Sequence, residues 1–176
     1  QLAGEVGALD PAAIEEVQRE SWPVVRDPDE LHDALLTLLW LPVEEVQSWA
    51  MHLPRLIEEG RAVELNVRGE AQEVRGWVAT EHRDQMESML TSGDEAATDA
   101  TVLGWMESVG PTTSLELATR LHVPSDSIHG SLLRLESSGQ ILRGQFRPHV
   151  VLSTQHSALA GAGAPEWCHR RLLARI

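Results

Sequence analysis

Arginine side chains collect near the end of this chain of 176 residues, and the planar guanidinium group is well suited to binding phosphate oxygens. From residue 139 onward, five arginines face a single acidic residue, Glu166. A nucleic-acid-binding protein gains most of its affinity from cations that release counterions, so we expect any phosphate contact to come from this region. The candidate contact residues are Arg134, Arg143, Arg147, Trp167, Arg170, Arg171 and Arg175.

Trp167 stands near two of these cations in the sequence. A helix is predicted over residues 165–176, and on it Trp167 precedes Arg170 by three residues and Arg171 by four. The indole ring and the guanidinium groups then share one face. Two interpretations stay open: this face stacks on nucleic-acid bases, or it makes a cation–π contact with a neighbouring domain. Four other tryptophans follow apolar helix or strand patterns and are expected in the core: Trp40, Trp49, Trp77 and Trp105.

Other chemistries find little support in the sequence. The chain has no lysine, so it contains neither the lysine of a P-loop nor the amine of a Schiff base. The eight histidines show no metal-ligand spacing. Cys168, Leu172 and Ile176 recur every fourth residue of the predicted helix, which is typical of a buried stripe rather than of a nucleophile. We expect no catalytic residue, metal or cofactor in this chain.

The elements that must position these arginines are predicted within residues 102–153. A helix is followed by a Gly-Pro turn and by a short helix, whose start is marked by Thr113 and Glu116 in a capping-box arrangement. Pro124 opens a longer helix that ends at Gly139. Strands at 141–146 and 149–153, joined by a turn at Arg147-Pro148, then form a hairpin. This order of elements is typical of a winged helix.

A weaker copy of the same pattern lies upstream. The segment LPRLIEEGRAVEL matches LLRLESSGQILRG at a constant offset of 79 residues. Asp27, Pro28 and Glu30 predict the start of a first helix, and a second helix over 43–59 is expected to stop at Gly60. Strands follow at 62–67 and 74–79, and ahead of both copies a helix is predicted from Asp10-Pro11 to the residues before Trp22-Pro23.

The predicted fold is therefore α+β and mostly helical, with two tandem winged-helix-type modules that carry small β-wings. Residues 1–97 form an acidic, degenerate module with a leading helix, and residues 98–176 form the second module plus a C-terminal arginine-rich helix. Segments 91–99 and 154–164 are expected to be mobile linkers.

The charge divides between the two halves. The net charge of −13 arises in residues 1–97, which hold 7 arginines against 21 acidic residues, whereas residues 98–176 hold 7 against 6. The acidic half is expected to be solvated or to bind a basic partner. No apolar run reaches the roughly 18 residues of a membrane span, which predicts no membrane contact. The single cysteine agrees with a cytoplasmic location, and the first residue, Gln1, indicates a piece of a longer soluble chain.

The helix after Pro124 is the one with which a winged helix usually reads the major groove. Its expected exposed side chains offer little base-directed chemistry, because bidentate readout favours arginine on guanine and an amide on adenine. We therefore favour sequence-independent contact through the wing and the last helix. The side chains in question are Asp126, Ser127, His129, Ser131 and Arg134.

Three segments resemble the long bacterial large helicase-related (Lhr) proteins, in the region after their motor domains: residues 10–38, 104–121 and, most specifically, EWCHRRLLARI at 166–176. The resemblance implies a parent that is a superfamily 2 ATP-dependent helicase. Such a parent moves on single-stranded DNA in DNA repair, holds ATP and Mg²⁺ in its motor, and carries tandem winged helices after it. The implied partners are single-stranded or partly duplex DNA and other domains of the same chain.

Three interpretations of function remain. The first is a non-catalytic tandem winged-helix region that contacts or guides nucleic acid and links the motor to C-terminal domains. The second is an interaction scaffold without DNA contact. The third is part of a winged-helix region similar to uracil-DNA glycosylases, although no glycosylase catalytic position matches this chain. The parent would hydrolyse ATP, whereas no turnover is expected of this piece.

Overall fold

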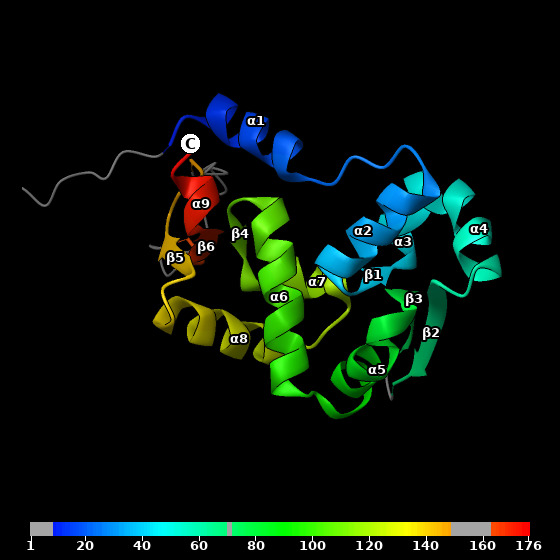
Figure 1. Cartoon of the computed structure of the whole chain (residues 1–176). Coiled ribbons are helices and arrows are strands. Elements are labelled where there is room, and N and C mark those ends of the chain that lie inside the picture. The colour runs from blue at the N-terminus through cyan, green and yellow to red at the C-terminus, as the bar shows by residue number, and fades with distance from the viewer. Residues whose placement is uncertain (1–8, 70–71, 149–162) are drawn as a thin grey trace, which may run out of the picture.

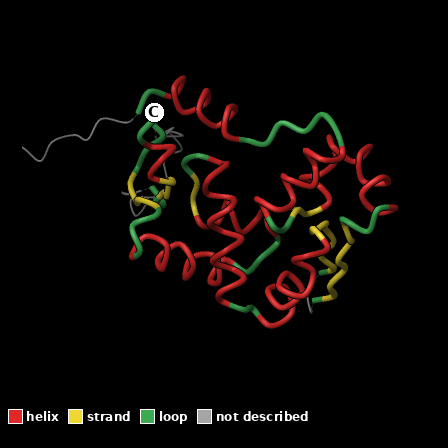
Figure 2. Tube along the Cα trace, viewed as in Figure 1, coloured by secondary structure: helices red, strands yellow, loops and turns green. Residues whose placement is uncertain are grey.

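The computed structural model describes residues 9–69, 72–148 and 163–176. Within them the protein is a mixed α+β structure, mostly helical, with two small antiparallel sheets (Figure 1, Figure 2). Helix α6 lies at the centre, and α1 lies along one side of the molecule (Figure 1). None of the helices in this part of the chain combines the length and apolar character that crossing a bilayer requires.

Helix α1 (Pro11–Ser21) begins and ends where the sequence predicts. The side chain of Asp10 accepts a hydrogen bond from the Ala12 N–H at 3.0 Å, which caps the helix. Its buried residues, Ile14 and Val17, face the rest of the protein. A proline after Trp22 ends the helix by forcing extended backbone.

The first module comprises the elements from α2 to α5. They are α2 (Pro28–Leu38), β1 (Leu41–Pro42), α3 (Val43–Val46), the 3₁₀ helix η1 (Gln47–His52), α4 (Leu53–Glu58), β2 (Ala62–Arg68), β3 (Glu73–Ala79), the 3₁₀ helix η2 (Thr80–His82) and α5 (Arg83–Ser92). Asp27 caps α2 by accepting from the Glu30 N–H at 2.8 Å. The Glu30 carboxylate accepts from the Arg26 N–H, one residue earlier than a capping box requires.

The prediction of one helix over residues 43–59 is wrong. The segment is divided into α3, η1 and α4, and Pro54 lies in the first turn of α4. Proline has no N–H and its ring collides with the carbonyl group of residue i−4, so a single helix could not continue through this position. The 3₁₀ stretch turns Trp49 into the core, where it is 7% exposed.

The second module comprises the elements from α6 to α9. They are α6 (Glu95–Val109), β4 (Thr112–Thr113), α7 (Ser114–Leu121), α8 (Ser125–Ser137), β5 (Ile141–Gly144), β6 (Glu166–His169) and α9 (Arg170–Leu173). The capping box of Thr113 and Glu116 is present, with both hydrogen bonds formed. Gly139, which follows α8, has a φ of 74°, as its predicted role as a left-handed stop requires.

The predicted helix over residues 165–176 is also wrong. Residues 166–169 form β6, which pairs with β5 and β4, and only four residues after it are helical. All four β6 residues are buried, so the strand lacks the polar alternation that reveals a half-exposed strand. The strand predicted at 149–153 lies outside the described residues.

The segment 91–99, predicted as a mobile linker, is instead a tight connection between two helices. Helix α5 ends at Gly93, which has a φ of 67°, and Asp94 caps α6 by accepting from the Ala97 N–H at 2.7 Å. The segment 154–164 lies outside the described residues except at its last two positions.

The two sheets have the same strand order, β1-β3-β2 and β4-β6-β5. Their registers are equivalent, because Glu64 lies opposite Trp77 in the first sheet and Arg143 lies opposite Trp167 in the second. The first residues of β2 and β5 are thus separated by the same 79 residues as the two copies of the sequence repeat.

One buried apolar cluster runs through both modules, from Leu31 of α2 to Trp167 of β6. The indole of Trp40 donates to the carbonyl oxygen of Leu121 at 2.8 Å, and the indole of Trp105 donates to that of Trp40 at 3.1 Å. The proposed boundary between residues 97 and 98 falls inside α6 and stays a prediction.

A cluster of aromatic rings around Arg120 strengthens this junction. The guanidinium carbon of Arg120 lies 5.0 Å from the ring centres of both Trp22 and Trp105. Its nitrogens donate to the Glu45 carboxylate at 2.8 and 2.9 Å. Since Trp22 precedes the first module, Glu45 lies within it and Arg120 belongs to the second, the cluster joins three segments that are distant in sequence.

Candidate nucleic-acid interface

The seven predicted contact residues lie in the second module, on or beside α8, β5, β6 and α9. They do not form one continuous cationic surface. One of them is buried, four arginines are ion-paired within the chain, and two arginines are exposed outside these pairs.

Trp167 is fully buried, at 0% exposure, so its predicted place on an exposed face is wrong. Its indole N–H donates to the carboxylate of Glu136 at 3.2 Å, and its ring meets the edge of His129 with 5.6 Å between ring centres. Glu136 and His129 both belong to α8, so Trp167 lies on the side of the sheet that packs against this helix. It cannot present an indole to a base without unfolding this sheet.

The guanidinium group of Arg134 on α8 is paired with carboxylates of α6, although the side chain stays partly exposed. Its guanidinium group donates three hydrogen bonds of 2.8 to 3.1 Å to Asp99, and Glu95 lies 3.8 Å away. Partial burial opposes ionisation of Asp99, but the hydrogen bonds from Arg134 outweigh it and the pKa of this carboxyl is lowered. The ion pair therefore connects α8 to α6.

Arg147, which follows β5, is held by two carboxylates. It donates to Glu116 of α7 at 2.8 Å and also pairs with Glu166 of β6. The Glu166 carboxylate, 6% exposed, accepts further bonds from the backbone N–H groups of Phe146 and Arg147 at 2.6 and 3.0 Å. Partial burial opposes ionisation of Glu116, but the bonds from Arg147 and the Thr113 N–H lower its pKa overall.

The remaining arginines differ in how much charge they offer to solvent. Arg143 lies 3.3 Å from Glu136 and is half exposed, and Arg175 pairs with Glu20 of α1. Arg170 and Arg171 are exposed, and the ion pairs of the described residues include neither of them. They open α9 beside the end of α8, because the Arg170 N–H donates to the Gln140 carbonyl oxygen at 3.1 Å.

The outward face of α8 carries no unpaired cation. Asp126 and His129 are exposed as predicted, but Ser131 is buried at 0% exposure, which corrects its predicted place on the surface. With Arg134 paired to Asp99, the exposed charged or titratable side chains that were predicted on this face reduce to Asp126 and His129. Neither provides the bidentate donors that read guanine or adenine.

Cys168 is chemically quiet in this setting. Burial, together with the charge of Glu166, raises the pKa of its thiol to about 12, so the thiolate is scarce near neutral pH. Its side chain packs against Val17 of α1 and Leu172 of α9. Within the described ranges no group of three histidine, cysteine or acidic side chains could hold a metal ion.

The carboxylates that neutralise these arginines are what sequence reasoning missed. Asp99, Glu116 and Glu166 lie 35, 31 and 19 residues from their arginine partners. Pairs of this kind leave no local spacing signal, unlike i, i+4 pairs on one helix. One local signal existed in the sequence: the capping box predicted that Glu116 is held at the start of a helix, where an arginine could reach its carboxylate.

Neither a family model, nor a curated protein, nor a solved structure matches this chain.

Proposed function

We propose that this chain is a non-catalytic pair of winged-helix modules from an Lhr-like ATP-dependent DNA helicase, and that it holds or guides nucleic acid beside the motor. The observation that carries the proposal is the repetition of one framework. Each module runs helix, strand, helix, helix, strand, strand, with the first strand paired to the third and the third to the second. A positive-φ glycine, Gly60 or Gly139, precedes the second strand in both.

The packing supports a role as a rigid connector. The modules share one apolar cluster, and the indole bonds of Trp40 and Trp105 cross between them. Helices α4 and α8, which occupy the groove-reading position in the proposed modules, lie at opposite ends of the molecule (Figure 1). Because of this separation, the pair would track or space nucleic acid rather than read one duplex face with both helices.

The proposed contact surface is Arg170 and Arg171 of α9, with half-exposed Arg143 on β5 of the preceding sheet. Contact through so few cations is weak and independent of sequence, and each neutralised phosphate adds a slope of about 0.7 to 0.9 to the salt dependence. The DNA of a translocating helicase is held chiefly by its motor, so a weak secondary contact suits a guiding role.

Binding of labelled single-stranded and partly duplex DNA, measured by fluorescence anisotropy over a salt series, tests the proposal. Substituting Arg170→Ala and Arg171→Ala together should weaken binding about tenfold and reduce the salt slope by about 1 to 2. A matched control is Arg68→Ala with Arg83→Ala, which removes two exposed arginines from the first module. Salt-dependent binding that survives the first double variant, or is lost equally in the control, would contradict this contact surface.

The interaction scaffold is a second candidate because a specific observation favours it. Four of the predicted contact arginines are already neutralised by carboxylates of the same chain. Complete absence of DNA binding at low salt would support this alternative.

A further inference from the structure

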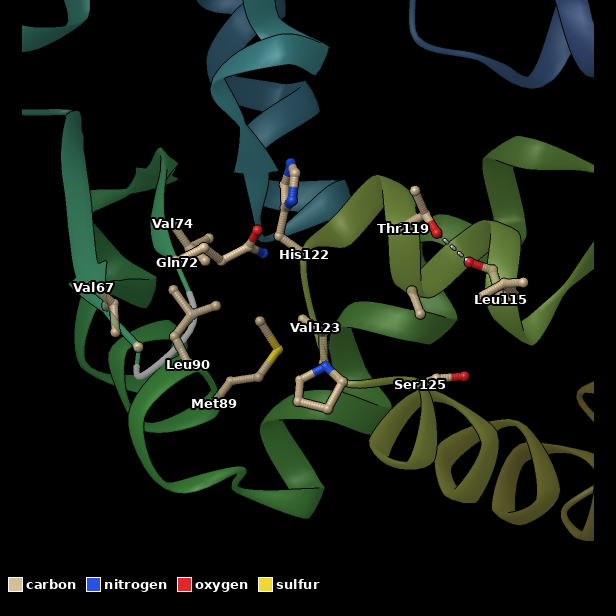
Figure 3. A pocket seen from close by; sticks show the side chains of 13 residues that line it. Val67, Gln72, Val74, Met89, Leu90, Leu115, Thr119, His122, Val123 and Ser125 are labelled. Carbon is tan, nitrogen blue, oxygen red and sulfur yellow. Dashed lines mark hydrogen bonds between the residues drawn. The ribbon is translucent and has the colours of Figure 1, made fainter.

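A groove separates the hairpin of the first module from α7 of the second. Its volume is about 810 Å³, which falls within the range of sites that accept a ligand or a few anchoring side chains. One wall consists of the β2–β3 hairpin and α5, and the other of α7 and the turn into α8 (Figure 3). The groove is formed only because the two modules pack together.

The lining of this groove is apolar on both walls. Figure 3 shows Met89 and Leu90 on one side and Val123 on the other. Leu115 on α7 is 67% exposed, an unusual position for a leucine on a helix that is otherwise strongly amphipathic. The main apolar lining residues are Val67, Val74, Met89, Leu90, Leu115 and Val123.

The exposed face of α7 has the spacing of a helix-packing surface. Leu115 and Thr119 lie one turn apart on this face, and His122, which caps the end of α7, continues the same groove wall. The apolar residues of both walls, with the polar side chains of Thr119 and His122 beside them, form a surface against which the apolar face of a partner can pack. A helix laid along this surface places its own i, i+3, i+4 and i+7 anchors into the groove.

The rim of the groove is acidic. Glu44 lies 3.2 Å from the imidazole of His122, the exposed Asp126 follows the lining residue Ser125, and Glu87 lies one turn before Leu90 on α5. Two cations lie next to lining residues in the sequence: Arg68 follows Val67, and Arg120, which is paired with Glu45, follows Thr119. With a net charge of −13 on the chain, the field at this groove attracts a basic partner and repels phosphate.

We propose that this groove binds one amphipathic helix of another protein domain, with apolar anchors on one face and lysine or arginine on the other. The apolar lining supplies the affinity, and the carboxylates at the rim select the charge. This inference is independent of the proposed nucleic-acid contact, which lies on Arg170 and Arg171.

The test uses the whole chain and a labelled synthetic helix of leucine and lysine, about 18 residues long or five turns, with the leucines at i, i+3, i+4 and i+7. Binding is measured by fluorescence anisotropy at physiological salt. The wild-type chain should bind this peptide at least tenfold (about 1.4 kcal/mol) more tightly than a leucine–glutamate peptide of the same pattern or a leucine–lysine peptide with shuffled order.

The groove itself is tested by Leu115→Ser combined with Thr119→Arg, two exposed positions whose change should leave folding intact, as circular dichroism would verify. This double variant should lose about tenfold in affinity for the leucine–lysine peptide. Met51→Ser removes an equally exposed apolar side chain, 76% exposed, outside the groove, and should change affinity less than about twofold. Equal binding by the double variant and the wild type, or equal binding of the patterned and shuffled peptides, would overturn the proposal.

Discussion

The two modules share one backbone plan but carry different chemistry at matching positions. Opposite the tryptophan of the third strand, the first module has Glu64 and the second has Arg143. Glu64 accepts a hydrogen bond of 2.6 Å from Arg75, whereas Arg143 pairs with Glu136. The position opposite the tryptophan is thus acidic in the first module and basic in the second, although the strand register is the same. Such a difference is tolerated because exposed ion pairs contribute little to stability.

The two tryptophans at this position differ in how deeply they are buried. Trp77 is partly buried and packs against the edge of the shared core, whereas Trp167 is 0% exposed and hydrogen-bonded. The same position in the framework is therefore peripheral in one module and central in the other. Burial, and not the position in the repeat, decides how much each residue stabilises the fold.

Truncating the two tryptophans should separate the modules most clearly. Trp167→Ala is expected to cost about 3 to 5 kcal/mol of unfolding free energy, because it removes a fully buried ring and leaves the carboxylate of Glu136 without its indole donor. Trp77→Ala should cost less than half as much, since part of that ring already contacts water. Urea unfolding followed by far-ultraviolet circular dichroism measures both, and equal losses would refute the comparison.

Two helical glycines should respond in opposite directions to alanine. A Cβ atom on Gly104 of α6 would lie 2.1 Å from the backbone oxygen of Thr37, so Gly104→Ala should destabilise the junction between α2 and α6 by about 1 to 3 kcal/mol or more. On Gly130 of α8 the nearest atom is the end of the Arg134 side chain at 3.4 Å. Gly130→Ala should stabilise by about 0.5 to 1 kcal/mol, because alanine favours the helix.

Thermal unfolding of the two glycine variants provides the measurement. An unchanged melting temperature for Gly104→Ala would show that α2 and α6 are not in close contact. That result would also undermine the single core on which the rigid connection between the modules rests.

A smaller effect is expected on the pH dependence of stability, and it arises from His169 in the second sheet. Burial lowers the pKa of His169, and the charges of Arg171 and Arg170 act in the same direction against the opposing effect of Glu107. Its Nδ1 accepts a hydrogen bond from the Arg171 N–H at 3.3 Å and so caps α9 in the neutral form.

The sign of this effect follows from proton linkage. The pKa of His169 in the folded protein lies below the ordinary histidine value of 6.5, so the unfolded chain binds more protons as the pH falls through 6.5. The stabilisation is complete above that pH and is lost as the pH falls toward the folded pKa. His169→Asn keeps a capping oxygen without the titration and should flatten the slope of stability between pH 7 and 5. An unaltered slope in chemical denaturation series at these pH values would disprove the assignment.

Much of the local structure could be predicted from single residues. Asp10, Asp27 and Thr113 accept hydrogen bonds at helix starts, and Gly60 and Gly139 take positive φ at helix ends, as their types require. The internal repeat also led to the correct starts of β2 and β5. These features depend on neighbours within a few residues, which the sequence displays directly.

The candidate site could not be predicted in the same way. The helical periodicity around Trp167 suggested an exposed aromatic and cationic face, but residues 166–169 form the central strand of a sheet, and all four of them are buried. Likewise the sequence predicted Arg134 and Arg147 as available cations, whereas in the folded protein carboxylates from α6, α7 and β6 pair with them. A pattern in sequence reports the preference of a segment, and burial by distant elements can override it.

The sequence by itself determined the starts of α1, α2 and α7, the repeated order of elements and the division of charge between the halves, because caps, turns and composition act locally. Only the tertiary structure decided which cations stay available, that one core joins the two modules, and that an apolar groove opens between α7 and the β2–β3 hairpin. Each of these depends on contacts between residues far apart in the chain, which exist only after the apolar surfaces have been buried together.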